Sequence, residues 1–190
     1  TARELGVAAL CQAAQVEAST HSWPQADFLA LWRQGLNTGA EQPALRAGDR
    51  MVSYAELEQQ ANRFAHYLQA QGIAPGMTVA LCQERSIEWV TSLLAVLKLG
   101  AVYLPLDSRQ PAERLQQLLQ ASDARLLVHA FGDAQAAGLG VCPALAFDAA
   151  QHGDCSDQPP AVHIDPQQAS YILYTSGSTG QPKGVMHCFE

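Results

Sequence analysis

Apolar positions follow a helical spacing in some parts of the chain and form short continuous runs in others. The clearest helical pattern covers 53–72, where apolar residues recur every three or four positions. Ser53 and Glu56 form a capping box at its start, in which each side chain satisfies an unpaired backbone N–H, and Gly72 can end the helix. The apolar run 77–82 follows, and it predicts a buried strand.

The alternation of helix and strand continues towards the carboxyl end. Residues 86–100 predict a helix with Ser86 as N-cap, and 110–123 predict another with Pro111 at its first helical position. Further strands are predicted at 101–107, 125–130, 144–147 and 169–175, and a polar, proline-rich loop at 154–168. Strands that alternate with helices in this way predict an α/β fold with a mainly parallel sheet, whose ligands bind beyond the carboxyl ends of strands.

The first part of the chain is less informative. Residues 1–26 carry an alanine-rich helical pattern followed by a polar stretch, which we interpret as a connector or an upstream segment. Residues 27–36 predict a helix with Asp27 as N-cap. We expect its apolar stripe to pack into the core; the stripe consists of Phe28, Leu31, Trp32 and Leu36.

Composition excludes several classes of function. The 190 residues are 48% hydrophobic and carry a net charge of -7 without a basic run, which argues against nucleic-acid binding. No run reaches the roughly 18 apolar residues of a membrane span, and no secretory signal is seen. Five scattered cysteines without a C-x-x-C pair suggest no metal site and favour a reducing cytoplasm. His152 and Cys155 are expected to be solvated side chains of a loop.

One stretch, YTSGSTGQPKGV at 174–185, has a composition suited to phosphate. Its glycines (Gly177, Gly180 and Gly184) permit positive φ and a close backbone approach to an anion. Its hydroxyls (Thr175, Ser176, Ser178 and Thr179) can donate hydrogen bonds, and Lys183 adds a positive charge. The spacing matches neither the G-x-x-x-x-G-K-[ST] loop nor G-x-G-x-x-G. A flexible linker is the alternative, but the stretch directly follows a predicted strand.

Three stretches in order resemble the adenylate-forming superfamily, which includes acyl-CoA synthetases, luciferases and the adenylation domains of nonribosomal peptide synthetases. SYILYTSGSTGQPKGV at 170–185 resembles the signature loop of that superfamily. VSYAEL at 52–57, with ANRFAHYL at 61–68, is similar to the first core motif of the peptide synthetase branch, and LKLGAVYLPLD at 97–107 to its second. Within the second motif, we expect Lys98, Tyr103, Pro105 and Asp107 to shape the fold rather than to contact ATP.

The resemblance implies that 27–190 is the N-terminal part of an adenylation domain, an incomplete N-terminal subdomain cut after the loop. The parent enzyme would join ATP and an amino acid into aminoacyl-AMP and pyrophosphate, then pass the acyl group to the phosphopantetheine thiol of a peptidyl carrier protein. By resemblance the loop binds ATP phosphates through Thr175, Ser176, Gly177, Ser178, Thr179, Gly180 and Lys183. The ligands of Mg²⁺ and the catalytic residues are expected mostly outside this chain, and a condensation domain could lie upstream.

Two alternatives remain open from the sequence. One is a fragment of an acyl- or aryl-CoA synthetase, which shares the adenylation step but has a different acceptor. The other is a non-catalytic, truncated adenylation-like module that docks a partner. His187 follows the loop earlier than the histidine of the family pattern, so no family role is transferred to it. We expect the 190 residues alone to catalyse no adenylation.

Overall fold

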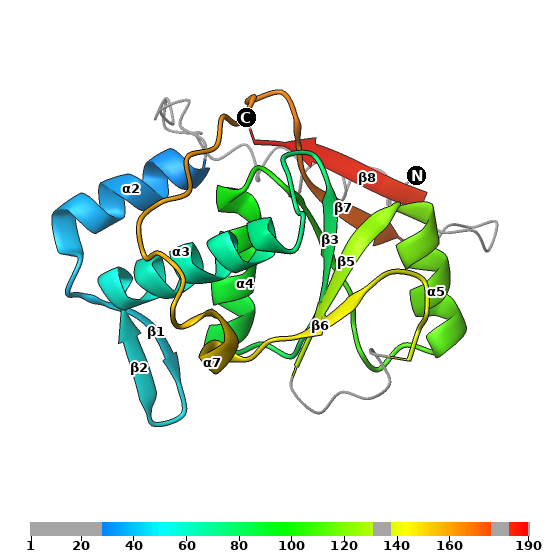
Figure 1. Ribbon diagram of the computed structural model, residues 1–190, viewed down its shortest axis with the longest axis horizontal. Helices are drawn as coiled ribbons and strands as arrows, with labels where there is room; N and C mark the ends of the chain where they lie inside the picture. The colour runs from blue at the N-terminus through cyan, green and yellow to red at the C-terminus, as the bar shows by residue number, and fades with distance from the viewer. Residues whose placement is uncertain (1–27, 131–137, 176–182, 190) are drawn as a thin grey trace, which may run out of the picture.

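A computed structural model describes residues 28–130, 138–175 and 183–189 (Figure 1). Within these residues a six-stranded sheet has the order β6-β5-β3-β4-β7-β8. Neighbouring strands are parallel except β8, which is antiparallel to β7. The strands are β3 (Thr78–Cys82), β4 (Val102–Pro105), β5 (Ala124–His129), β6 (Ala144–Ala146), β7 (Ala169–Thr175) and β8 (Lys183–Cys188). The predicted α/β fold with a mainly parallel sheet is confirmed.

Helices cover both faces of the sheet (Figure 1). The connection from β3 to β4 contains α4 (Ile87–Lys98), and that from β4 to β5 contains α5 (Ala112–Ala121). Because β4 and β5 lie on opposite sides of β3, the two right-handed crossovers place these helices on opposite faces. The other described helices are α2 (Phe28–Gly39), α3 (Tyr54–Ala70) and the short α7 (Ala149–His152).

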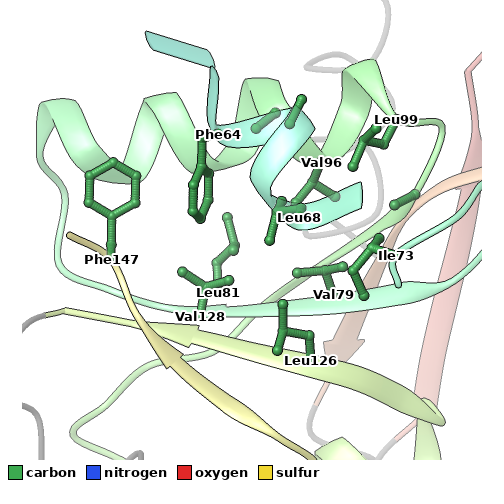
Figure 2. Packing of buried hydrophobic residues seen from close by; sticks show 13 residues of the cluster. Phe64, Leu68, Ile73, Val79, Leu81, Val96, Leu99, Leu126, Val128 and Phe147 are labelled. Carbon is green, nitrogen blue, oxygen red and sulfur yellow. The ribbon is translucent and has the colours of Figure 1, made fainter. Parts of the chain in front are cut away.

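The core consists of two apolar layers separated by the sheet. Figure 2 shows the layer under α3 and α4, where Phe64 and Leu68 pack towards Val79, Leu81 and Val128. The opposite layer joins leucines of α5 to side chains of the sheet; it includes Leu115, Leu118, Leu119, Ala80, Cys82 and Leu104. Successive residues of β3 therefore enter opposite layers, and all five are buried, as expected for a central parallel strand.

The predicted helix caps at Ser53 and Ser86 are confirmed, and the position predicted for Pro111 is corrected. Glu56 N donates to Ser53 Oγ at 3.2 Å, and Ser53 N donates to Glu56 Oε2 at 2.7 Å. Ser86 Oγ accepts from Trp89 N at 3.1 Å at the start of α4. Pro111 occupies the N-cap of α5 rather than its first helical position, with an extended ψ of 145°.

The hairpin before α3 was not predicted. Strands β1 (Pro43–Ala47) and β2 (Arg50–Ser53) pair antiparallel through a turn in which Gly48 has a φ of +61°. A glycine adopts this left-handed conformation without the steric cost that a Cβ imposes. Only Val52 of these two strands is buried, so the hairpin lacks the apolar alternation that marks a core strand.

Two predictions about burial need correction. The stripe on α2 enters the core only in part: Trp32 packs against the cluster that includes Leu57, whereas Phe28 and Leu31 each remain 47% exposed. The buried residue of α2 is Leu29. Helical spacing predicted the helix, but the buried side depends on where α3 lies. Asp27 and residues 1–26 lie outside the described residues.

His152 is the second correction, since it is buried rather than solvated. Its exposed fraction is 4%, and its ring lies 5.0 Å, centroid to centroid, from the rings of both Phe64 and Phe147. This burial lowers the pKa of His152, against a smaller opposing effect of the nearby Asp148. Among the described residues, no group of three or more His, Cys, Asp or Glu side chains could hold a metal ion.

Candidate phosphate-binding site

The candidate site is the connection between β7 and β8. Strand β7 ends at Thr175 and β8 begins at Lys183, and these two residues are partners in the antiparallel register. Both side chains are exposed. Five of the predicted site residues (Ser176, Gly177, Ser178, Thr179 and Gly180) lie outside the described residues. The structure therefore brings together Thr175 and Lys183, the two ends of the predicted loop.

The register places Thr175 and Lys183 at the edge of the sheet where parallel strands end. Strand β7 runs parallel to β4, and β4 runs parallel to β3. The carboxyl ends of all three strands therefore lie at one edge, the edge at which open α/β sheets bind ligands. The chains leaving β3 and β4 pass to opposite faces of the sheet. Between them a pocket of about 560 Å³ is lined by residues that include Arg85, Trp89, Asp107 and Arg109.

Gly184 has a packing role that was not predicted. Its φ does not lie in the left-handed region that glycine permits. It pairs with Tyr174 across the two strands, and an added Cβ would lie 3.1 Å from Tyr174 Cε1. The same Cβ would lie 3.4 Å from Ile172 Cγ2. Glycine at this position therefore lets the Tyr174 ring cover β8 directly beside the loop, and burial raises the pKa of Tyr174.

Contacts at the other end of the hairpin fix β8 to β7. The hydroxyl of Ser170 lies within hydrogen-bonding distance of the carbonyl oxygens of His187 and Cys188, at 3.0 and 2.8 Å. The rings of Tyr171 and His187 stack with centroids 4.8 Å apart and an interplanar angle of 16°. Sequence reasoning missed these contacts, since they depend on the pairing of β8, which was not predicted as a strand.

Two residues of the second motif, Lys98 and Asp107, make contacts within the fold, as expected. Lys98 Nζ donates to Glu58 Oε1 at 2.6 Å and so joins α4 to α3. Asp107 accepts from Arg109 Nε and Nη2 at 2.9 and 2.8 Å and from the backbone N–H of Arg109 at 3.0 Å. These hydrogen bonds from Arg109 lower the pKa of the Asp107 carboxyl to about 2.

The fold is that of an N-terminal subdomain of the adenylate-forming type, as comparison with solved structures shows. The N-terminal subdomain of *Klebsiella oxytoca* NpsA is 28% identical with a TM-score of 0.75, over 86% of this chain and 42% of that chain. The N-terminal domain of *Mycobacterium tuberculosis* FACL13 is 29% identical with a TM-score of 0.79, over 87% of this chain and 45% of that chain.

Sequence comparison identifies the family. The model of the AMP-binding enzyme family matches residues 31–189, and the chain belongs to that family. It is 41% identical to surfactin synthase subunit 3 of *Bacillus subtilis* over 159 residues, which is 82% of this chain and 12% of that protein. It is 42% identical to phosphinothricin tripeptide synthetase PhsC of *Streptomyces viridochromogenes*, over 75% of this chain and 14% of that protein. The chain thus spans only a small part of the length of these relatives.

Proposed function

We propose that the chain is the front part of an amino-acid-activating adenylation domain. The observation that carries this proposal is the pairing of Thr175 with Lys183 at the carboxyl end of β7, which holds both ends of a hydroxyl- and glycine-rich loop. The identity to peptide synthetases supports the choice of substrate class. In this proposal residues 27–190 belong to the adenylation domain, and 1–26 are a connector or upstream segment.

The loop would hold the β- and γ-phosphates of ATP. In the reaction, the carboxylate of an amino acid attacks the α-phosphate, and pyrophosphate leaves with the negative charge that develops. Hydroxyl donors of Thr175, Ser176, Ser178 and Thr179, backbone N–H groups near Gly177 and Gly180, and the ammonium of Lys183 would stabilise that charge. This segment needs no side-chain nucleophile or general base for that role.

Magnesium would act together with the bound nucleotide. Mg²⁺ prefers a few carboxylates and the phosphate oxygens of its substrate. The described residues offer no carboxylate cluster for it, so we assign it no ligand among them. When bound, Mg²⁺ would neutralise charge on the phosphates.

The partners follow from the same proposal. The activated amino acid would pass to the phosphopantetheine thiol of a peptidyl carrier protein, and a condensation domain could precede residue 1. We also propose a cytoplasmic setting, supported by free cysteines at Cys82, Cys142, Cys155 and Cys188. No helix among the described residues is long and apolar enough to cross a membrane.

A CoA synthetase is the second candidate, favoured by one observation. A fatty acyl CoA synthetase of *Mycobacterium tuberculosis* has a TM-score of 0.76 and 28% identity to this chain. The higher identity to peptide synthetases favours amino-acid activation instead.

A direct experiment separates the candidates. The complete adenylation domain containing this chain is assayed for ATP–pyrophosphate exchange with each amino acid, and for CoA thioester formation with fatty and aryl acids. The proposal predicts exchange with one or a few amino acids and no CoA thioester. CoA thioester formation would establish the second candidate, and inactivity in both assays would indicate a non-catalytic docking module.

A further inference from the structure

A small pocket lies between α2, α3, the end of α4 and the loop 153–168. Its volume is about 270 Å³, close to that of the smaller ligand pockets of proteins, and most of its lining residues are apolar. Trp32 of α2 belongs to this apolar lining, as do Pro160 and Ile164 of the loop. The pocket therefore has the size and the walls to hold a small molecule with an apolar body.

The pocket lies away from the candidate phosphate-binding site. Helix α4 begins after the carboxyl end of β3 and ends before the amino end of the parallel strand β4, so it runs opposite to both strands. Lys98 lines the pocket and is the last residue of α4, so it lies towards the edge of the sheet where the strands begin. Thr175 and Lys183 lie at the other edge. A ligand in this pocket would be bound in addition to the nucleotide.

A buried ammonium group belongs to the lining of the pocket. The side chain of Lys98 is 8% exposed, and its Nζ donates to Glu58 Oε1 at 2.6 Å. An ammonium has three N–H donors, and the described residues provide an acceptor for one of them. Because a buried donor without an acceptor is costly, the remaining N–H groups of Lys98 favour an acceptor inside the pocket.

The charges of the lining favour a negatively charged acceptor. Both oxygens of Glu58 already accept hydrogen bonds, since Oε1 also accepts from Asn62 Nδ2 at 3.3 Å and Oε2 accepts from Trp32 Nε1 at 2.6 Å. Arg33 is a second cation of the lining, and among the described residues it forms no ion pair. Its Nε donates to the carbonyl oxygen of Leu29 at 3.0 Å. Arginine and lysine thus outnumber the one carboxylate of the lining, and opposite charge attracts an anion.

We propose that this pocket binds a small monocarboxylate with an apolar body, such as an arylacetate or a branched-chain acid. Its carboxylate accepts from Lys98 Nζ and from the guanidinium of Arg33, and charge-assisted hydrogen bonds of this kind are about twice as strong as neutral ones. Its apolar body lies against Trp32, Pro160 and Ile164, and burial of that body adds to the binding free energy. The inference does not rest on the proposed function, since none of these residues belongs to the stretch 174–185.

Binding of phenylacetate to the complete adenylation domain tests this inference. Isothermal titration calorimetry should give a Kd of about 1 mM or lower, which is ordinary for a ligand of this size. Phenylacetamide has the same shape without the charge and should bind at least tenfold more weakly. A saturating concentration of the activated amino acid should leave the Kd of phenylacetate unchanged, because the pocket is separate from the catalytic site.

Three outcomes of this titration would overturn the inference. The first is no binding of either phenylacetate or 3-methylbutanoate at about 10 mM, which would leave the pocket to water. The second is equal affinity for phenylacetate and phenylacetamide. The third is displacement of phenylacetate by the amino acid, which would place the probe in the substrate site.

Two variants locate the bound carboxylate. Lys98→Met/Glu58→Gln removes the ion pair as a unit and should weaken phenylacetate binding at least tenfold. Arg33→Gln changes an exposed residue, so it keeps the test decisive where the double variant does not fold, and it should weaken binding at least threefold. Arg125→Gln, at an exposed arginine of β5, is the matched control and should leave the Kd unchanged.

Lys183→Ala separates this inference from the proposed function. It should bind phenylacetate like the unmodified domain, so a failure of the proposed phosphate site leaves the carboxylate pocket standing. A Kd within twofold of the unmodified domain for Arg33→Gln and for a folded Lys98→Met/Glu58→Gln would overturn the assignment of the carboxylate to this pocket.

Discussion

The Nζ atom of Lys98 lies 2.6 Å from Oε1 of Glu58, and their side chains are only 8% and 15% exposed. Glu58 also accepts through Oε2 from Trp32 Nε1 at 2.6 Å. One partly buried carboxylate therefore links α2, α3 and α4. Lys98 of the second motif thus forms an ion pair with Glu58 of α3, the helix that begins within the first motif.

Removing one partner of this ion pair should destabilise the fold strongly. Lys98→Met leaves the Glu58 carboxylate without its cation; this costs about 3–5 kcal/mol for a fully buried pair and should cost somewhat less here, because Glu58 keeps the hydrogen bonds from Trp32 and Asn62. The double variant Lys98→Met/Glu58→Gln should recover part of this loss, because no charge is left unpaired. Urea unfolding measures both. Arg50→Met, which breaks the exposed pair with Glu88, is the control and should cost less than about 1 kcal/mol. Equal losses for Lys98→Met and Arg50→Met would contradict this account.

Gly184→Ala should destabilise the hairpin that carries the loop. Its Cβ would lie 3.1 Å from Tyr174 Cε1, and overpacking of this kind costs about 1–3 kcal/mol. Adding Tyr174→Leu should relieve the contact and reduce the penalty of the alanine. Gly35→Ala is the matched control: it lies in α2 with its nearest neighbour at 4.0 Å, so alanine should stabilise the helix by about 0.5–1 kcal/mol. Thermal unfolding of the three variants decides between packing and backbone effects.

We expect the stability of the fold to depend on pH, because His152 is buried. Its folded pKa is lowered from 6.5 by burial, so the unfolded chain binds a proton more readily. Neutral His152 contributes fully to the free energy of unfolding above about pH 6.5. This free energy should fall as the pH drops below that value. His152→Leu, which fills the same aromatic site, should reduce the fall in unfolding free energy between pH 7.5 and 5.5. An identical fall in both proteins would show that His152 is not its source.

The sequence predicted correctly those elements in which the local pattern of capping and apolar residues matches the residues that are buried. The capping box of Ser53 and Glu56, the stripe that includes Leu57, Phe64 and Leu68, and the apolar run of β3 are all found where predicted. In these elements, local propensity and tertiary packing favour the same structure.

The remaining elements depend on contacts between distant segments. All six residues of strand β8 are exposed, so its sequence lacks the apolar pattern of a core strand. The strand is formed by its pairing with β7. The exposed Phe28 and Leu31 follow from the place of α2 relative to α3, which periodicity does not encode. At the site, composition indicated phosphate binding. Two features of the site could not be predicted, because they depend on the pairing of β7 with β8. These are the pairing of Thr175 with Lys183 and the packing of Tyr174 against Gly184.

The exchange rate of Lys183→Ala tests the central claim most directly. Lys183 is the sole cation of the stretch 174–185 and begins β8 directly opposite Thr175. In the complete adenylation domain, Lys183→Ala should lower amino-acid-dependent ATP–pyrophosphate exchange at least tenfold, which corresponds to about 1.4 kcal/mol of transition-state stabilisation. Arg125→Ala removes a surface cation of β5 paired with Asp123, and should leave exchange unchanged. Exchange by Lys183→Ala within twofold of the unmodified domain would contradict the assignment of this hairpin to the phosphates of ATP.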